Sequence, residues 1–280
     1  MISVSLNYNR SDANISSDIT ADVQVDLLEN DIPIISGGWQ CSIRRNGKSL
    51  CRISDWQENY LQSDDENIGC ELIEIESELD NNFRLRRFLL LDTVNQIFIA
   101  GDVVSCSKGV KRIREVELQY ESSFIYSDML QAAPLSRGGK SDIIFRPYSN
   151  LRGQLKPLSF RVIPFALSSV RFLRAIDGRI CLSQDCCCGL SIFAPLFFDF
   201  KLSRISKPAI WRELTVGENM EKVTSDNAVG YRIKIDKDQF LIYYSLTSPA
   251  NRTLLGHNLI DSICYAKFDP KSGVNPLLTK

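Results

Sequence analysis

Apolar and polar residues alternate with a period of two along most of the chain, whereas the spacing of an amphipathic helix is rare. The clearest alternation is in residues 70–79, where glutamates separate leucine and isoleucine. Turn residues follow at 80–82, and a second apolar run at 83–91 completes a hairpin that places the glutamates opposite arginines. Residues 96–104 are almost continuously apolar, which predicts a central strand covered on both faces. These segments predict a meander whose charged side chains face water.

Similar short runs continue to the end of the chain, separated by turn residues. Further strands are predicted at residues 111–120, 141–148, 159–167, 179–184, 190–200, 209–216, 229–235, 239–246 and 262–268. Ambiguous apolar spacing predicts short helices near 128–133 and 217–220, and a loop at 134–140 is the first break. There is no alternation of strands with helices and no G-x-G-x-x-G motif. The sequence therefore predicts an all-β fold: one large antiparallel β-sandwich over residues 1–280, supersandwich-like, with few short helices and a sub-boundary near 134–140.

The charged residues nearly cancel, because Lys and Arg number 33 and Asp and Glu number 34. No overall field draws the protein to nucleic acid or to an anionic membrane surface, so we expect neither partner. The most apolar stretches, 88–100 and 190–200, are too short or too interrupted by polar residues to cross a bilayer. Residues 1–20 include several charged side chains and lack the apolar run of an export signal, so we expect a soluble, cytoplasmic protein.

Cysteine and histidine usage restricts metal chemistry, since the chain has nine cysteines and a single histidine, His257. Cys186, Cys187 and Cys188 are consecutive and would alternate between the two faces of a strand, and no C-x-x-C pair occurs. We therefore expect no metal and no cofactor. The odd cysteine count is atypical of a disulfide scaffold and predicts reduced, mostly buried thiols.

The densest set of ligand-binding side chains lies at residues 243–258. Aromatic rings stack on sugars, arginine binds a carboxylate or sulfate as a fork, and asparagine recognises hydroxyl groups. The ligand-binding candidates are Tyr244, Asn251, Arg252, His257 and Asn258, with Trp211 as an additional stacking ring. Such a set suits an acidic polysaccharide. The alternative is that the polar side chains satisfy backbone groups in a long connection, and that Trp39, Trp56 and Trp211 pack in the core.

Several short blocks give the chain a resemblance to a known family. They are Gly38-Trp39, Asn46-Gly47, Asp55-Trp56, the acidic strand 70–79, and residues 86–92, 100–102, 194–199, 211–216, 228–232 and 251–256. In these blocks the chain resembles the C-terminal β-sandwich of heparinase II/III-type polysaccharide lyase proteins, and in particular uncharacterised heparinase-like proteins of planctomycete bacteria. The resemblance spans most of the chain, but none of the blocks is a catalytic motif. It therefore implies a fold rather than an activity.

In heparinase-type lyases a helical toroid carries most of the catalytic residues, and this chain has no segment that could form one. The resemblance thus implies a binding, scaffolding or degenerate relative, and no family residue is carried over as catalytic. Our leading hypothesis is a non-catalytic or accessory β-sandwich with a polysaccharide-binding cleft near residues 243–258. The first rival is a polysaccharide lyase-like enzyme acting on acidic glycans, with Tyr244 as proton mover, Arg252 as charge neutraliser and His257 as second acid-base group. The second rival is a protein-interaction subunit with an exposed apolar patch.

Overall fold

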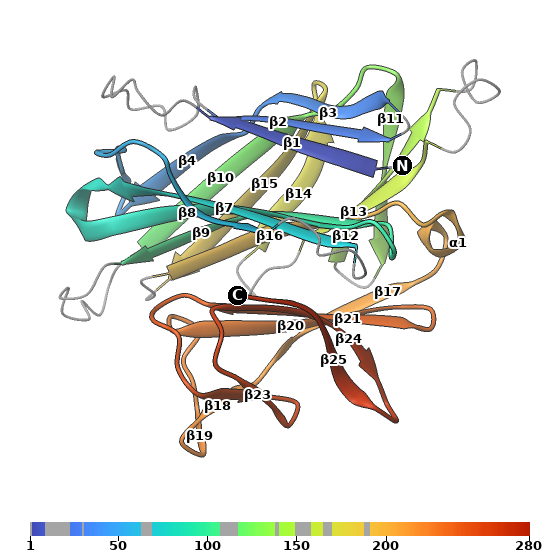
Figure 1. The fold of residues 1–280 in the computed structure, drawn as a ribbon. Coiled ribbons are helices and arrows are strands. Elements are labelled where there is room, and N and C mark those ends of the chain that lie inside the picture. Colours follow the sequence, from blue (N-terminus) through green and yellow to red (C-terminus); the bar gives the residue numbers. More distant parts are fainter. Residues whose placement is uncertain are drawn as a thin grey trace.

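The protein folds into stacked antiparallel β-sheets (Figure 1). The computed structural model describes residues 2–8, 23–29, 31–62, 69–106, 117–137, 140–148, 158–164, 170–187 and 191–280. Every pair of neighbouring strands within these residues is antiparallel. The all-β, sandwich-like architecture that the alternation predicts is therefore confirmed. The described residues contain one helix, of four residues, and one 3-10 turn.

Two sheets form the top layer in Figure 1. The three-stranded sheet consists of β1 (Ile2–Tyr8), β2 (Val23–Glu29) and β3 (Ile32–Gly38). The upper sheet has the strand order β14-β15-β10-β4-β5 and consists of β14 (Val170–Ile176), β15 (Arg179–Cys187), β10 (Glu117–Ile125), β4 (Gln40–Arg45) and β5 (Lys48–Ser49). Strand β3 lies against β10, which joins the two sheets.

The central sheet has eight strands in the order β11-β12-β13-β16-β9-β8-β7-β6. They are β6 (Gln57–Gln62), β7 (Cys70–Leu79), β8 (Phe83–Asp92), β9 (Ile97–Cys106), β11 (Leu130–Arg137), β12 (Lys140–Pro147), β13 (Phe160–Pro164) and β16 (Ser191–Asp199). The 3-10 turn η1 (Asp80–Asn82) connects β7 to β8. The meander expected over residues 70–104 is confirmed as β7, β8 and β9.

The C-terminal third forms two further sheets below the central one (Figure 1). The lower sheet, in the order β17-β20-β21-β24-β25, consists of β17 (Ala209–Leu214), β20 (Ala228–Ile235), β21 (Asp238–Ser245), β24 (Ile263–Asp269) and β25 (Gly273–Thr279). The small sheet, in the order β19-β18-β22-β23, consists of β18 (Val216–Glu218), β19 (Glu221–Lys222), β22 (Arg252–Leu254) and β23 (His257–Leu259). Helix α1 (Leu202–Ile205) carries the chain from the central to the lower sheet.

The inner strands of the central sheet, β13, β16, β9 and β8, are buried on both faces, and strand β8 shows how. Leu85 and Leu89 pack into the apolar cluster between the upper and central sheets, whereas Phe88 and Leu90 pack into the cluster between the central and lower sheets. Successive side chains of a strand point to opposite faces, so a strand with two covered faces needs an almost continuous apolar sequence. A third, smaller cluster fills the space between the lower and small sheets.

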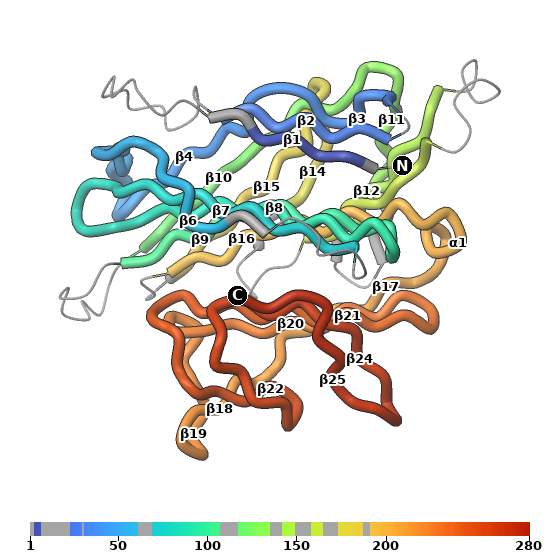
Figure 2. The backbone as a smooth tube through the Cα atoms, in the orientation of Figure 1, coloured from blue at the N-terminus to red at the C-terminus, as the bar shows by residue number. Residues whose placement is uncertain are grey.

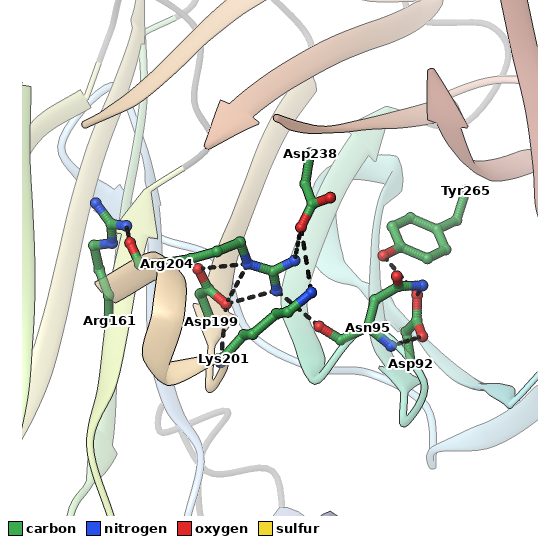
Figure 3. A network of polar contacts seen from close by, with 8 residues as sticks. All are labelled: Asp92, Asn95, Arg161, Asp199, Lys201, Arg204, Asp238 and Tyr265. Carbon is green, nitrogen blue, oxygen red and sulfur yellow. Dashed lines mark hydrogen bonds and ion pairs between the residues drawn. The ribbon is translucent and has the colours of Figure 1, made fainter. Parts of the chain in front are cut away.

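A buried polar network joins the central and lower sheets at one end of their interface (Figure 3). Arg204, in α1, donates to Asp199 at 2.7 Å, to Asp238 at the start of β21 at 2.7 Å and to the backbone oxygen of Asn95 at 2.7 Å. Nearby, the Tyr265 hydroxyl donates to Asp92 at 3.0 Å. The pKa of Asp238 is lowered: burial alone would raise it, but the hydrogen bond and charge of Arg204 outweigh burial. We call this network the Arg204 clamp.

Several local expectations are wrong. The short helices expected near 128–133 and 217–220 are instead a turn leading into β11 and the β18–β19 hairpin, in which Asn219 and Met220 have φ of 52° and 65°. Segments of four to six residues span fewer than two helical turns, so their apolar spacing does not distinguish a helix from a turn. The charged face of the β7–β8 hairpin is not fully solvated either, because Glu74, Arg86 and Arg87 are buried.

Two expectations involve residues that the structure only partly describes. The strand predicted at 111–120 is seen only from residue 117 onward, and residues 111–116 lie outside the described residues. The break at 134–140 falls at the end of β11 and the start of β12, with residues 138 and 139 outside the described part, and the two strands pair along their length. The division of the chain into domains stays a prediction.

Candidate functional site

A cleft of about 520 Å³ lies at the edge of the interface between the central and lower sheets. Glu74 and Glu76 of β7 and Arg84 and Arg86 of β8 line it on one side. Residues 246–249, Ser262 and Lys280 line it on the other. We call this hollow the interlayer cleft. Its volume lies within the range of about 300–1,000 Å³ that is usual for small-molecule sites.

Strand alternation explains why these charged residues face the lower sheet. Arg84 and Arg86 have the same parity in β8 as Phe88 and Leu90, which pack against the lower sheet. In the neighbouring strand, Glu76 is directly opposite Arg86. The interface between the two sheets therefore changes from apolar to charged as it approaches its open edge.

Glu74 is the acidic centre of the cleft and is 1 % exposed. Its carboxylate accepts hydrogen bonds from the Tyr244 hydroxyl and from the Asn59 amide, and it forms an ion pair with Lys280 at 2.6 Å. The C-terminal end of the chain comes to the level between the two sheets, which brings Lys280 to the cleft (Figure 2). The negative charge of Glu74 is thus already matched within the protein.

Tyr244 is fully buried, and its hydroxyl is turned to Glu74. Burial raises the pKa of Tyr244 well above its ordinary value of 10, and the Glu74 carboxylate adds to this effect although Arg86 opposes it. The phenol therefore stays protonated at neutral pH and acts as a donor to Glu74.

Arg86 carries the unmatched charge of the cleft. The residue is 8 % exposed, and its guanidinium lies over the Tyr244 ring at 5.0 Å from Cζ to the ring centre. Nη2 donates to the backbone oxygens of Leu246 at 2.9 Å and Ser245 at 3.4 Å, while Nε is buried without a partner. Within the described residues no carboxylate lies within ion-pair distance of Arg86. Glu76 pairs instead with Arg84, at 3.3 Å.

An arginine so placed favours an anionic ligand. A buried charge without a counter-ion is costly, and an arriving carboxylate or sulfate would relieve that cost while accepting hydrogen bonds from the planar guanidinium. Arg84 adds a second cation at the cleft, with its side chain 41 % exposed and its Nε buried without a partner. Among the charged side chains of the lining, the cations Arg84, Arg86 and Lys280 outnumber the acids Glu74 and Glu76.

The structure places the six candidates from the sequence at different positions. Tyr244 contacts the interlayer cleft through Glu74. Arg252 is 3 % exposed and lies on the other side of the lower sheet, because it bonds to Tyr243, which packs on the face of β21 opposite Tyr244. Trp211 is half-buried on β17, with its ring edge against Tyr231.

Arg252 is occupied by structural partners. It donates to Glu218 at 2.9 Å, to the Tyr243 hydroxyl at 3.1 Å and to the Ser245 hydroxyl at 2.7 Å. Burial would lower the pKa of Arg252, but these hydrogen bonds outweigh burial and raise it. These contacts tie the small sheet to the lower one.

The other candidates sit on the small sheet. Asn251 and Asn258 are exposed and His257 is half-buried. The expected long connection at 251–258 is a hairpin, in which β22 and β23 are joined by Leu255 and Gly256 with φ of 50° and 80°. No hydrogen bond within the described residues brings His257 together with Tyr244 or Arg252.

The tryptophans of the N-terminal half are core residues, as the packing alternative predicts. Trp39 and Trp56 are 1 % and 2 % exposed. The guanidinium of Arg87 lies between them, at 4.6 Å and 5.2 Å from the two ring centres, and pairs with Asp102 at 3.0 Å. This stack fills the space between the upper and central sheets and offers no ring to a ligand.

Metal ligands, cysteines and membrane-spanning helices were the other features sought in the described part of the chain. No group of three or more His, Cys, Asp or Glu side chains there is placed to hold a metal ion. Seven cysteines are free thiols there, and Cys41, Cys70 and Cys264 are buried, whereas Cys187 and Cys188 fall wholly or partly outside the described set. Among the same residues, none of the helices has the length and apolar character needed to span a bilayer.

Comparison with known proteins shows likeness in structure only. The sequence matches no protein-family model, and it matches no curated protein. A solved heparinase III with methylated lysines superposes with a TM-score of 0.51 at 11% identity, covering 80% of this chain and 36% of that chain. A second heparinase III structure gives 0.50 at 10% identity. The heparan sulfate lyase HepC from Pedobacter heparinus gives 0.46 at 9% identity, covering 82% of this chain and 41% of HepC.

The heparinase-like fold expected from the sequence is confirmed by the heparinase III structures. At such low identity the likeness concerns the fold alone. The chain spans about a third of the heparinase III chain that it matches, so the activity of the longer protein does not follow from the superposition.

Proposed function

We propose that the protein is an accessory β-sandwich that binds an acidic saccharide in the interlayer cleft and performs no chemistry on it. The observation that carries this proposal is Arg86, a buried guanidinium that lines the cleft without a carboxylate partner. A carboxylate or sulfate on a sugar has the negative charge and the paired acceptor oxygens of the partner that Arg86 lacks. The shared fold adds support, because heparinase III is named for acting on heparin.

The accessory role is supported by the positions of the residues that a lyase would need. Tyr244 is buried and donates to Glu74, so its oxygen does not face a ligand. Arg252 lies beyond the lower sheet with its own partners, and His257 lies on the small sheet. Closer kinship to planctomycete heparinase-like proteins stays a prediction, as does the equivalence of this chain to their C-terminal region.

Calorimetric titration with a heparin-derived oligosaccharide, an oligogalacturonate and uncharged dextran tests the binding. We expect the acidic ligands to bind and dextran not to bind in the cleft. Arg86→Met keeps much of the packing volume but removes the charge. It should weaken the binding of acidic ligands by tenfold or more, which corresponds to about 1.4 kcal/mol. Arg84→Met, at a partly exposed position, should weaken them less and tests the site without risk to folding.

Arg212→Met is the matched control, because Arg212 is an exposed strand arginine on β17, outside the cleft. Acidic ligands that bind no better than dextran at millimolar concentration would contradict the proposal, as would unchanged binding in both cleft variants. Ultraviolet absorbance of unsaturated sugar products separates the lyase alternative. Formation of such products by the wild type, lost in Tyr244→Phe, would overturn the accessory role.

A further inference from the structure

The outer face of the upper sheet carries a groove that is separate from the interlayer cleft. The opposite face of this sheet packs on the central sheet through Cys41, Ile43 and Tyr120, so the groove points away from the rest of the molecule. Two adjoining hollows of about 290 and 210 Å³ make up the groove. Ser42, Glu121 and Ser183 line both hollows. We call this feature the outer-face groove.

Strand register explains its shape. Glu121 of β10 lies directly opposite Ser42 of β4 on one side and Ser183 of β15 on the other, so the three residues form one row across the sheet. The row Gln40–Ser123–Cys181 precedes it along β4 and the row Arg44–Gln119–Asp185 follows it. Rows of the same parity are about 7 Å apart along the strands, so the three rows extend over roughly 14 Å. Four of the six side chains in the central row and the Gln40 row are small, namely Ser42, Ser183, Ser123 and Cys181, which leaves space for the hollows.

Two polar groups in the central row have no partner. Ser183 is 3 % exposed, lines both hollows and makes no hydrogen bond within the described residues. Glu121 is exposed and has neither a hydrogen bond nor an ion pair within the same residues. A hydroxyl that has no partner in the protein and lines a hollow can donate to or accept from a ligand, and a carboxylate accepts hydrogen bonds from ligand hydroxyls. The row therefore offers both a donor and an acceptor to a ligand.

The rest of the lining favours an uncharged ligand. Arg44 and Arg174 are balanced by Glu121 and Asp185, so there is no excess of either sign. The lining contains no aromatic ring, and its polar groups are hydroxyls, amides and charged groups of both signs. The groove lies in the middle of a sheet, where backbone groups are already paired, so an extended peptide has no free edge to join.

We propose that the outer-face groove is a second binding site, which takes a neutral, hydroxyl-rich ligand such as a short uncharged oligosaccharide. Sugar hydroxyls donate to Glu121 and exchange hydrogen bonds with Ser42 and Ser183. Gln40 and Gln119 extend this recognition into the two flanking rows, in which Gln40 accepts from Arg179 at 2.7 Å and Gln119 donates to Glu117 at 3.0 Å. Each amide keeps its other polar atom for a ligand. The site is independent of the interlayer cleft and of its proposed ligand.

The test is calorimetric titration of the full chain with uncharged oligosaccharides of glucose, mannose and xylose. At least one should bind, and Glu121→Gln should weaken it by about threefold to tenfold, because it replaces a charge-assisted acceptor by a neutral amide. Ser42→Phe, at an exposed position, should fill the groove and abolish binding without disturbing the core. Glu78→Gln is the control, because Glu78 is an exposed strand glutamate on β7 that lines neither hollow.

Arg86→Met separates this proposal from the function proposed for the cleft. Neutral-sugar binding that persists in Arg86→Met and disappears in Ser42→Phe supports the groove, whatever the cleft binds. Failure of all neutral probes at millimolar concentration overturns the proposal, and so does binding that Ser42→Phe leaves unchanged. Binding in the groove that is confined to acidic sugars or to peptides also overturns it.

Discussion

The interlayer cleft and the outer-face groove are both polar hollows, but one is formed between two layers and the other on a single sheet. In the cleft, groups of the lining also connect layers, since Arg86 donates to Leu246 and Glu74 accepts a hydrogen bond from Tyr244. In the groove, Glu121 and Ser183 have no other partner in the described residues. We therefore expect binding and stability to be coupled in the cleft and separable in the groove.

The largest effect that would test this difference is on folding. Glu74→Ala leaves Lys280 without its carboxylate and Tyr244 without its acceptor at a position 1 % exposed. We expect a loss of about 3–5 kcal/mol in the free energy of unfolding, as for other broken buried pairs. Glu121→Ala in the groove should change it by less than about 0.5 kcal/mol. Urea denaturation of both variants measures the two values, and similar losses would remove the distinction.

Alkaline pH should distinguish the two regions by the slope of stability against pH. Burial raises the pKa of Tyr120, Tyr231, Tyr244 and Tyr265 well above 10 in the folded protein. In the unfolded chain these phenols ionise near pH 10. The stability that they contribute is therefore complete below pH 10 and is lost as pH rises above it, by about 1.4 kcal/mol per pH unit for each tyrosine.

Tyr244 belongs to the cleft, and no tyrosine lines the groove. In Tyr244→Phe, the free energy of unfolding should thus fall less steeply with rising pH, by the contribution of one tyrosine. In Ser183→Ala it should fall with the wild-type slope. Urea denaturation at several pH values between about 9 and 11 gives the slopes. A Tyr244→Phe slope equal to that of the wild type would show that folding does not raise the pKa of this phenol.

Salt should affect the two binding sites unequally. The cleft lining has three cations and two acids, whereas the charged groups that line the groove balance. Raising the salt concentration from about 0.05 to 0.5 M should weaken the binding of an acidic oligosaccharide roughly fivefold. It should weaken the binding of a neutral one less than about twofold, because screening acts on net charge. Calorimetry at both salt concentrations provides the comparison. Equal salt dependence would mean that both ligands share one site.

The smallest expected effect is that of Ser183→Ala on folding. Removal of a hydroxyl that lines the groove and makes no hydrogen bond within the described residues should leave the free energy of unfolding within about 0.5 kcal/mol of the wild type. The same variant should weaken the binding of the neutral ligand by roughly twofold to tenfold, which is the effect expected for the loss of one hydrogen bond. A clear loss of stability without a change in binding would assign Ser183 to the structure alone.

Much of the fold could be predicted from the sequence because strand alternation is a local property. The meander β7–β9 follows from a period of two and from turn residues at 80–82. Helix α1 could not be predicted in this way, since four residues are too few to show a helical period. The hairpin β22–β23 was equally hidden, because three-residue strands show hardly any alternation.

The candidate site could be predicted only in part. Tyr244 was found as an aromatic residue next to polar ones, but its partner Glu74 lies 170 positions away in the sequence. The shared parity of Arg84 and Arg86 with the apolar Phe88 and Leu90 was a usable signal that these arginines face another layer. Which residues cover them depends on the stacking of sheets, and a local pattern does not report that stacking.

The inner strands of the central sheet, buried on both faces, have a consequence for how the molecule opens. Away from the interlayer cleft, amide hydrogens in β8, β9 and β16 are covered by both neighbouring layers and meet solvent when the upper or lower layer has moved away, and at the end of β16 the Arg204 clamp must also break. Local fraying therefore cannot reach them. The amide hydrogens of these strands should exchange with deuterium last. Their exchange rate would then report the opening of the whole stack rather than of any one hairpin.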